Sequence, residues 1–329
     1  MNFQNIILAN SINLTDEFEI MDEAAAAVES DLKLKDISSY KFSPALEACD
    51  EEMEYMCLEN VKAYAVTEGF KETASKYWER FKAFIVKIKN LIVRTVQRVI
   101  GYLKALFTRV AAKIVAKFRG KDAKKMSAKV KAGNRYVGRV DVYPKLLEVD
   151  TVDKLFKGGI TVNGKKIDIY EITLRSMLGL ESIKNLDEED RIRKVLEENF
   201  AEGLPSKSDI IEDILGDDTV EKEASGYADD IPNFVSSLQK AKIPKSVELF
   251  KKDIFKSIDK IEKEATKSKT ISSKRMSALT SFMNKIVQFF NAALAAVQQL
   301  CVMWLQARIK VVNKFYNATE DKEENEDEE

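Results

Sequence analysis

Apolar residues recur every three or four positions along two long stretches of the chain. The first stretch covers 81–118, and its apolar positions are Phe84, Ile85, Ile88, Leu91, Ile92, Val99, Leu103, Leu106, Phe107, Val110, Ile114 and Phe118. The second covers 272–315, with Met276, Leu279, Phe282, Met283, Ile286, Phe289, Phe290, Leu294, Val297, Leu300, Trp304 and Val312. This is the period of an α-helix that buries one face. The pattern predicts two long amphipathic helices, the first broken near Gly101 and ending around Arg119-Gly120, where Gly is a natural C-cap.

Shorter patterned segments are also predicted to be helical. One covers 45–64 and begins at Ser43-Pro44, because proline is tolerated in the first turn of a helix. Four more are expected at 171–180, 187–200, 208–215 and 231–241, with Ser208 and Asp209 as caps.

Only 160–162 and 166–169 look extended, and Asn163-Gly164 between them is a two-residue turn signal. The predicted fold class is therefore mostly α, with long amphipathic helices, a small helical body and at most one short β-hairpin.

The charge is unevenly distributed along the chain. The total of 53 basic and 54 acidic residues gives a net charge of −1. Residues 1–69 hold 15 acidic and 4 basic residues (−11), whereas 70–139 hold 20 basic and 3 acidic residues (+17). Residues 140–319 are neutral, and 320–329 hold 8 acidic residues and one lysine (−7). Such blocks are typical of interaction arms.

Charge and pattern together divide the chain into five segments. They are an acidic leader (1–68), a basic amphipathic segment (69–139), a neutral helical body with a hairpin near 160–169 (140–270), a long C-terminal helix (271–318), and an acidic tail (319–329). The tail has the composition of a disordered segment.

The basic segment allows three interpretations. A helix packed on the body with solvated lysines explains the apolar stripe but not the scarcity of acidic residues. A nucleic-acid-facing helix explains the imbalance, because cations neutralise phosphates. A helix lying on an anionic membrane explains it as well. The candidate nucleic-acid-facing residues are Arg80, Lys82, Lys87, Lys89, Arg94, Arg98, Lys104, Arg109, Lys113, Lys117, Arg119, Lys121, Lys124 and Lys125.

The second long helix contains 22 residues without a charge, from 286 to 307, which is long enough to cross a bilayer. It also carries five amide side chains, at Gln288, Asn291, Gln298, Gln299 and Gln306. Amides are costly in lipid, so a buried or self-associating helix is favoured over a membrane-inserted one.

The residue inventory argues against an enzyme. Histidine is absent, which excludes His-ligated zinc and haem sites and Ser-His or Cys-His nucleophiles. Neither nucleotide-binding glycine motif occurs. The odd cysteine count (Cys49, Cys57, Cys301) without metal spacing points to a reducing compartment. Acidic clusters at 188–190 and 217–218 sit at helix starts, where they favour the dipole. We therefore expect no cofactor, no metal and no secretory signal.

The change of sign in charge coincides with a recognisable sequence. Val66-Thr67-Glu68 followed by Gly69 ends the acidic leader, and Ala45-Leu46-Glu47 followed by Ala48 is a second instance of the same pattern. An acidic leader, such a site and then a basic amphipathic helix resembles the prohead core and internal head proteins of large tailed phages. In that family a maturation protease cuts after the glutamate once the shell has assembled. The resemblance covers about the first 140 residues.

The resemblance implies a structural protein of the virion interior, present in the host cytoplasm during assembly. Its implied partners are phage DNA, bound without sequence preference, and capsid or core proteins, with self-association possible. Removal of 1–68 would change the net charge from −1 to +10 and favour DNA. The alternative is a membrane-active protein that uses helices 81–118 and 286–307 on or in a bilayer.

Overall fold

Helices dominate the structure. The computed structural model describes residues 44–67, 74–117, 137–157, 159–162, 164–167, 205–216, 218–227, 230–240, 245–267 and 273–320. In these ranges, strands are confined to two small two-stranded sheets. The mostly α fold class is confirmed. The helices expected at 171–180 and 187–200, and the tail from 321 onward, lie outside the described residues.

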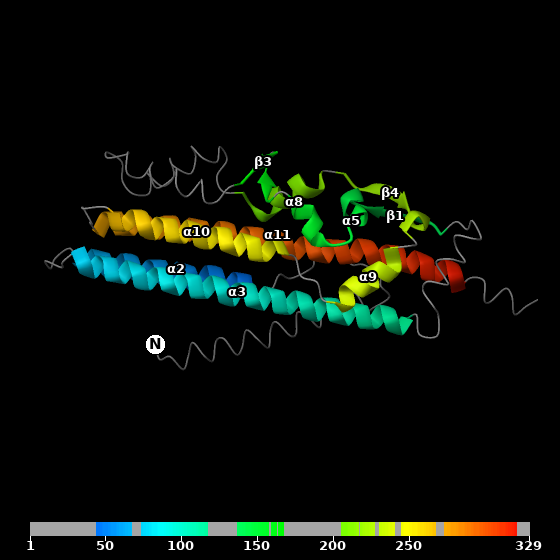
Figure 1. Cartoon of the computed structure of the whole chain (residues 1–329), viewed down its shortest axis with the longest axis horizontal. Coiled ribbons are helices and arrows are strands. Elements are labelled where there is room, and N and C mark those ends of the chain that lie inside the picture. The colour runs from blue at the N-terminus through cyan, green and yellow to red at the C-terminus, as the bar shows by residue number, and fades with distance from the viewer. Residues whose placement is uncertain are drawn as a thin grey trace, which may run out of the picture.

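The long helices of the described chain form an elongated bundle (Figure 1). They are α2 (Pro44–Thr67), α3 (Ala74–Lys117), α10 (Lys245–Lys267) and α11 (Ser273–Glu320). α3 and α11 extend along nearly its whole length, whereas α2 and α10 accompany one half of it (Figure 1). α2 and α10 each contact both α3 and α11, so they flank the α3–α11 pair.

Pair contacts fix the helix directions. Arg80 bonds the Ala63 carbonyl, and Arg94 bonds Glu52. The sequence separation of the bonded residues thus grows with their distance from the α2–α3 connection. This is the pattern of two antiparallel helices. The ring centroids of Phe250 and Phe289 are 5.8 Å apart. Because these residues lie at nearly equal distances from the α10–α11 connection, α10 and α11 are antiparallel as well. The bundle is therefore built from two helical hairpins.

The apolar stripe of α3 lies in the core, as the spacing predicts. Its buried positions are Phe81, Phe84, Ile85, Ile88, Leu91, Ile92, Val96, Val99, Tyr102, Leu103, Leu106, Phe107, Val110 and Ile114. Burial of each large apolar side chain stabilises the fold by about 1.5–3 kcal/mol before entropic costs.

The expected break at Gly101 is wrong, because α3 is one continuous helix. Gly101 lies on the exposed side, and a glycine inside a helix costs only about 1 kcal/mol relative to alanine. The burial of Tyr102 and Leu103 next to it exceeds that cost.

α10 was absent from the sequence-based prediction, although its signal is present. Val247, Ile254, Ile258 and Ile261 recur at helical spacing and are all buried. The charged positions between them are mixed in sign. α10, which lies within the predicted 140–270 segment, packs on α3 and α11 and is part of the bundle.

Smaller elements cover the C-terminal half of α11 (Figure 1). They are α5 (Pro144–Glu148), the 3-10 helix η2 (Val152–Phe156), α8 (Lys207–Leu215), the 3-10 helix η3 (Ala224–Tyr227) and α9 (Asp230–Gln239). α9 also packs on α3. Trp304 of α11 lies in this region, with its ring 5.3 Å from that of Phe234 in α9 and its indole N–H donating to the Val149 carbonyl at 3.2 Å.

An unpredicted antiparallel sheet joins β1 (Arg139–Val142) to β4 (Val220–Glu223). β1 alternates as a half-buried strand does, with Val140 and Val142 inside. β4 reads Val-Glu-Lys-Glu and is largely exposed, so it has no hydrophobic alternation to detect. Its pairing with β1 across about 80 residues is a tertiary event.

The predicted hairpin is confirmed. β2 (Thr161–Val162) pairs with β3 (Lys165–Lys166) around the expected turn, and Gly164 adopts φ +70°, which glycine tolerates without strain. Asp213 of α8 holds the hairpin by accepting hydrogen bonds from the Thr161 hydroxyl and, at 3.1 Å, from the Gly164 amide.

α8 starts one residue earlier than predicted, and its N-cap lies two residues earlier. Ser206, not Ser208, is the N-cap, and its hydroxyl accepts from the Asp209 amide at 3.3 Å. The Asp209 carboxylate accepts from the Ser206 amide at 2.7 Å, which completes a capping box. Asp209 therefore caps as expected, and Ser208 is exposed.

Candidate nucleic-acid interface

α3 carries a strongly one-sided charge. Its 44 residues contain eleven Lys or Arg and a single acidic residue, Glu79. At 1.5 Å per residue the helix is about 66 Å long. Its apolar side is buried in the core, so its cations are confined to the remaining surface.

Several of the predicted cations are exposed to solvent. They are Lys82, Lys87, Arg94 and Lys104, and Lys76 near the start of α3 is also exposed. Lys76 was not among the predicted residues, although its place in the basic segment could have indicated it. The Lys82 ammonium lies 5.2 Å from the centre of the Trp78 ring, a cation–π contact that restrains the lysine without neutralising it.

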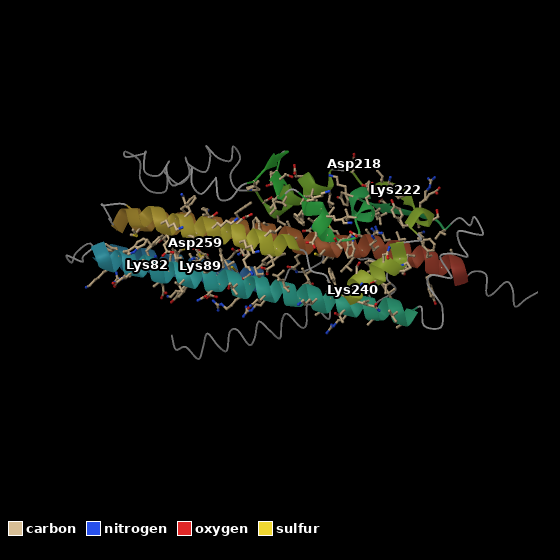
Figure 2. All side chains as sticks on the ribbon, in the orientation of Figure 1. Lys82, Lys89, Asp218, Lys222, Lys240 and Asp259 are labelled. Carbon is tan, nitrogen blue, oxygen red and sulfur yellow. The ribbon has the colours of Figure 1, made fainter. Side chains whose placement is uncertain are left out.

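Two of the predicted cations, Lys89 and the exposed Arg94, form ion pairs with neighbouring helices. Lys89 forms an ion pair with Asp259 of α10. Figure 2 shows these two residues close together where α3 and α10 adjoin. Arg94 pairs with Glu52 of α2 at 2.6 Å. Pairs exposed to this extent contribute only about 0–1 kcal/mol, so phosphate can compete for these cations at low cost.

The outermost surface of α3 is not cationic. Exposed positions there include Ala83, Asn90, Gln97, Gly101 and Thr108, which are small or uncharged. The cations lie along both borders of this uncharged ridge, one facing α2 and the other α10. The sequence predicted the number of cations correctly, but their division into two rows depends on which helices pack beside α3.

The remaining predicted cations are only partly described. Arg80, Arg98 and Arg109 are half-buried. Lys113 and Lys117 belong to the last two turns of α3. The other four predicted residues, Arg119, Lys121, Lys124 and Lys125, lie outside the described residues.

An acidic helix lies next to this cationic surface. α2 contains six acidic residues and one lysine, and Glu51, Glu54 and Glu59 are exposed. Since Glu52 already pairs with Arg94, the acidic leader places negative charge along one border of α3.

The two candidate cleavage sites occupy different positions. Val66 and Thr67 end α2, and Glu68 and Gly69 lie outside the described residues. Residues 45–48, which are Ala45, Leu46, Glu47 and Ala48, form the first turns of α2, and Leu46 is buried. Because the backbone there is helical, cleavage at this second site requires those turns to unwind.

The uncharged part of α11 is a core segment. α11 is the helix of the described chain whose length and composition would allow it to cross a membrane, and 78% of its most apolar window is buried. Asn291 donates to the Asp50 carboxylate at 2.6 Å, whereas the Gln306 amide is buried without a hydrogen-bond partner. Burial of this helix agrees with the expectation of a helix buried in protein.

The described residues offer little for metal or nucleophile chemistry. They contain no group of His, Cys, Asp or Glu side chains that could hold a metal ion. Cys49, Cys57 and Cys301 are buried free thiols. Burial raises the pKa of Cys57 to about 12, with a smaller contribution from Glu54, and it raises the pKa of Cys49 and Cys301 as well. None of these thiols is activated.

Comparison of the chain with protein-family models, with curated protein sequences and with solved structures finds no significant match. The fold alone therefore defines the class of protein: the described residues form an elongated bundle of two long helical hairpins, with small helices and strands packed along the C-terminal half of α11.

Proposed function

We propose that this protein is an internal structural component of the head of a large tailed phage. In this proposal it associates without sequence preference with packaged DNA, through α3 and the basic segment that follows it. The observation that carries the proposal is the ratio of eleven cations to one acidic residue on a helix whose apolar side is already buried. A packing role alone accounts for the stripe but not for this ratio.

The dimensions of the cationic surface suit a polyanion. From Lys76 to Lys104 the helix advances about 42 Å, a length over which duplex DNA carries about 25 phosphate charges. The aromatic side chains Phe81, Phe84 and Phe107 are buried, and they are not available for stacking on unpaired bases. This supports contact with the phosphate backbone.

The acidic leader acts as a counter-charge in this proposal. The family resemblance implies a maturation cut after Glu68, which would separate a leader of net charge −11 from a remainder of +10. Contact between acidic α2 and cationic α3 supports this part of the proposal, because the leader then lies against the cations that DNA would neutralise.

The first test is the composition of purified virions. Mass spectrometry of the virion interior is expected to detect this chain with an N-terminus at Gly69. Absence of the chain from virions would overturn the proposed function, and an N-terminus at Met1 would overturn the maturation cut.

The second test is DNA binding by the processed protein from virions, measured across salt concentrations. The triple variant K82Q/K87Q/K104Q removes three exposed cations from α3. We expect its slope of log affinity against log salt to fall by up to about 3, since each phosphate contact contributes about 0.9.

The matched control removes equal charge from another helix. Lys252, Lys256 and Lys263 are exposed on α10, and K252Q/K256Q/K263Q is expected to retain most of the salt dependence. Equal losses in both variants would mean that α3 is not the DNA surface. No binding by the processed wild-type protein at any salt concentration would reject the DNA association.

The membrane-active alternative requires the bundle to open, because the apolar side of α3 and the uncharged part of α11 face the core. Flotation with anionic liposomes is expected to leave the protein unbound. Co-flotation, together with faster hydrogen exchange in α11, would favour that alternative.

A further inference from the structure

α2 belongs to the acidic leader, and it is also a core element. Leu46, Cys49, Met53, Met56 and Cys57 form its inner stripe, and none of them is more than 8% exposed. They pack into the groove between α3 and α11, and α2 contacts both helices. The structural unit thus includes residues that the proposed maturation cut would separate from the rest of the chain.

Polar contacts fix the register of α2 in this groove. The Asn60 amide donates to the Thr280 hydroxyl at 3.1 Å, and the Asn291 amide donates to Asp50 at 2.6 Å. These bonds join positions 220 and 241 residues apart in sequence. At the opposite border of the helix, Glu52 pairs with Arg94. None of these contacts depends on the connection 68–73.

We infer that the groove between α3 and α11 is a binding site for an acidic amphipathic helix, and that α2 stays bound there as a separate chain after residues 68–73 are cut. The natural cut rests on the proposed function, but the binding site does not. The cut by itself then leaves the complex at its original net charge of −1. Unmasking of α3 needs a second step, the departure of the leader.

The ligand that this groove accepts has a defined pattern. It presents apolar side chains at the spacing of positions 46, 49, 53 and 56, an amide at position 60, and carboxylates on the outer side. This is helix-in-groove recognition, with anchors at three- and four-residue intervals. While α2 is tethered, its effective concentration is high, and a cut removes that advantage without changing any contact.

The first experiment cuts the full-length chain at a single place. A recognition sequence for a specific protease is inserted into 68–73, and the cut protein is analysed by size-exclusion chromatography and circular dichroism. We expect both fragments to co-elute with unchanged helix content. Separation of the fragments, or aggregation of the cut protein, would overturn the inference.

The second experiment measures exchange into the groove. A fluorescent peptide of residues 44–67 is added to the cut protein, and its anisotropy reports binding as it replaces the resident leader. M53D places a charge at a position that is 0% exposed and is expected to weaken binding at least about 100-fold. E54Q changes an exposed position and is the matched control, expected within about threefold of the unmodified peptide. Equal binding of all three peptides would also overturn the inference.

DNA binding separates the two proposals. Two samples are each titrated with DNA. One is the cut complex, and the other is the same protein after its leader fragment has been removed on a column. Co-elution without DNA binding in either state leaves the peptide site standing and rejects the DNA association. Spontaneous separation of the fragments together with DNA binding rejects the peptide site and supports the DNA association.

Discussion

Gln306 and Arg308 lie two residues apart on α11, and substitutions at the two positions are expected to change stability in opposite directions. The Gln306 side chain is 3% exposed, and neither its amide nitrogen nor its amide oxygen has a hydrogen-bond partner. The Arg308 side chain is 4% exposed, and its guanidinium donates to the carbonyls of Leu147 and Val149, the latter the C-cap of α5. The Gln306 amide thus makes no hydrogen bond, whereas the Arg308 guanidinium bonds two carbonyls through Nη2, although its buried Nε has no hydrogen-bond partner.

The expected magnitudes follow from this difference. A buried amide without a partner costs about 1–3 kcal/mol relative to an apolar group of the same shape. Gln306→Met keeps the length of the side chain and should raise the free energy of unfolding by about 1–3 kcal/mol. Arg308→Met leaves the Leu147 carbonyl without its donor and removes charge-assisted bonds, so it should lower the free energy of unfolding by about 2–4 kcal/mol.

Urea unfolding followed by circular dichroism measures both effects. With a slope of about 3 kcal/mol per molar urea, Gln306→Met should shift the midpoint upward by about 0.3–1 M. Gln288→Met is the matched control, because Gln288 is an exposed amide on the same helix and should change stability by less than about 0.5 kcal/mol. A neutral or destabilising Gln306→Met would refute the reasoning, since it would mean that the amide is bonded in the native state.

Three further predictions concern stability and reactivity. Gly101→Ala should raise the free energy of unfolding by about 0.5–1 kcal/mol, because an added Cβ meets nothing within 4 Å; a lower urea midpoint would contradict this. Burial raises the pKa of Asp50 above its usual value despite the Asn291 hydrogen bond, so the native state binds this proton more tightly than the unfolded chain does. Stability from this group is therefore highest in acid and falls as the pH rises through the native pKa. Asp50→Asn should accordingly stabilise the protein more at pH 7 than at pH 3, by less than about 1 kcal/mol, and equal effects in urea titrations at the two pH values would exclude this cause. Cys57, with its pKa raised to about 12, should not react with a disulfide reagent at pH 8 until urea unfolds the chain; rapid labelling of the native protein would disprove its burial.

The long helices illustrate where sequence periodicity is sufficient. The stripes of α3 and α11 repeat over many turns and locate both helices, although α3 begins seven residues before the predicted stretch and α11 ends five residues after it. Over such lengths the apolar period outweighs a local signal, which is why Gly101 does not interrupt α3. For β4 no such period exists, and its pairing with β1 depends on a chain segment about 80 residues away.

The candidate interface shows the same division. The excess of cations on α3 can be counted in the sequence. Which of them form ion pairs cannot be counted in this way, because the partners of Lys89 and Arg94, Asp259 and Glu52, come from other helices. Lys82 and Lys104 lie at exposed positions of the same helix.

By itself, the sequence determined the helical class, the two long amphipathic helices, the hairpin turn and the block pattern of charge. These are properties of local spacing and composition, which the chain carries before it folds. Only the tertiary structure decided that α2 belongs to the core, because an acidic composition does not reveal that Met53 and Cys49 fill a groove between helices distant in sequence. α2 is thus acidic toward solvent and apolar toward the bundle. Packing, and not net charge, holds it against α3.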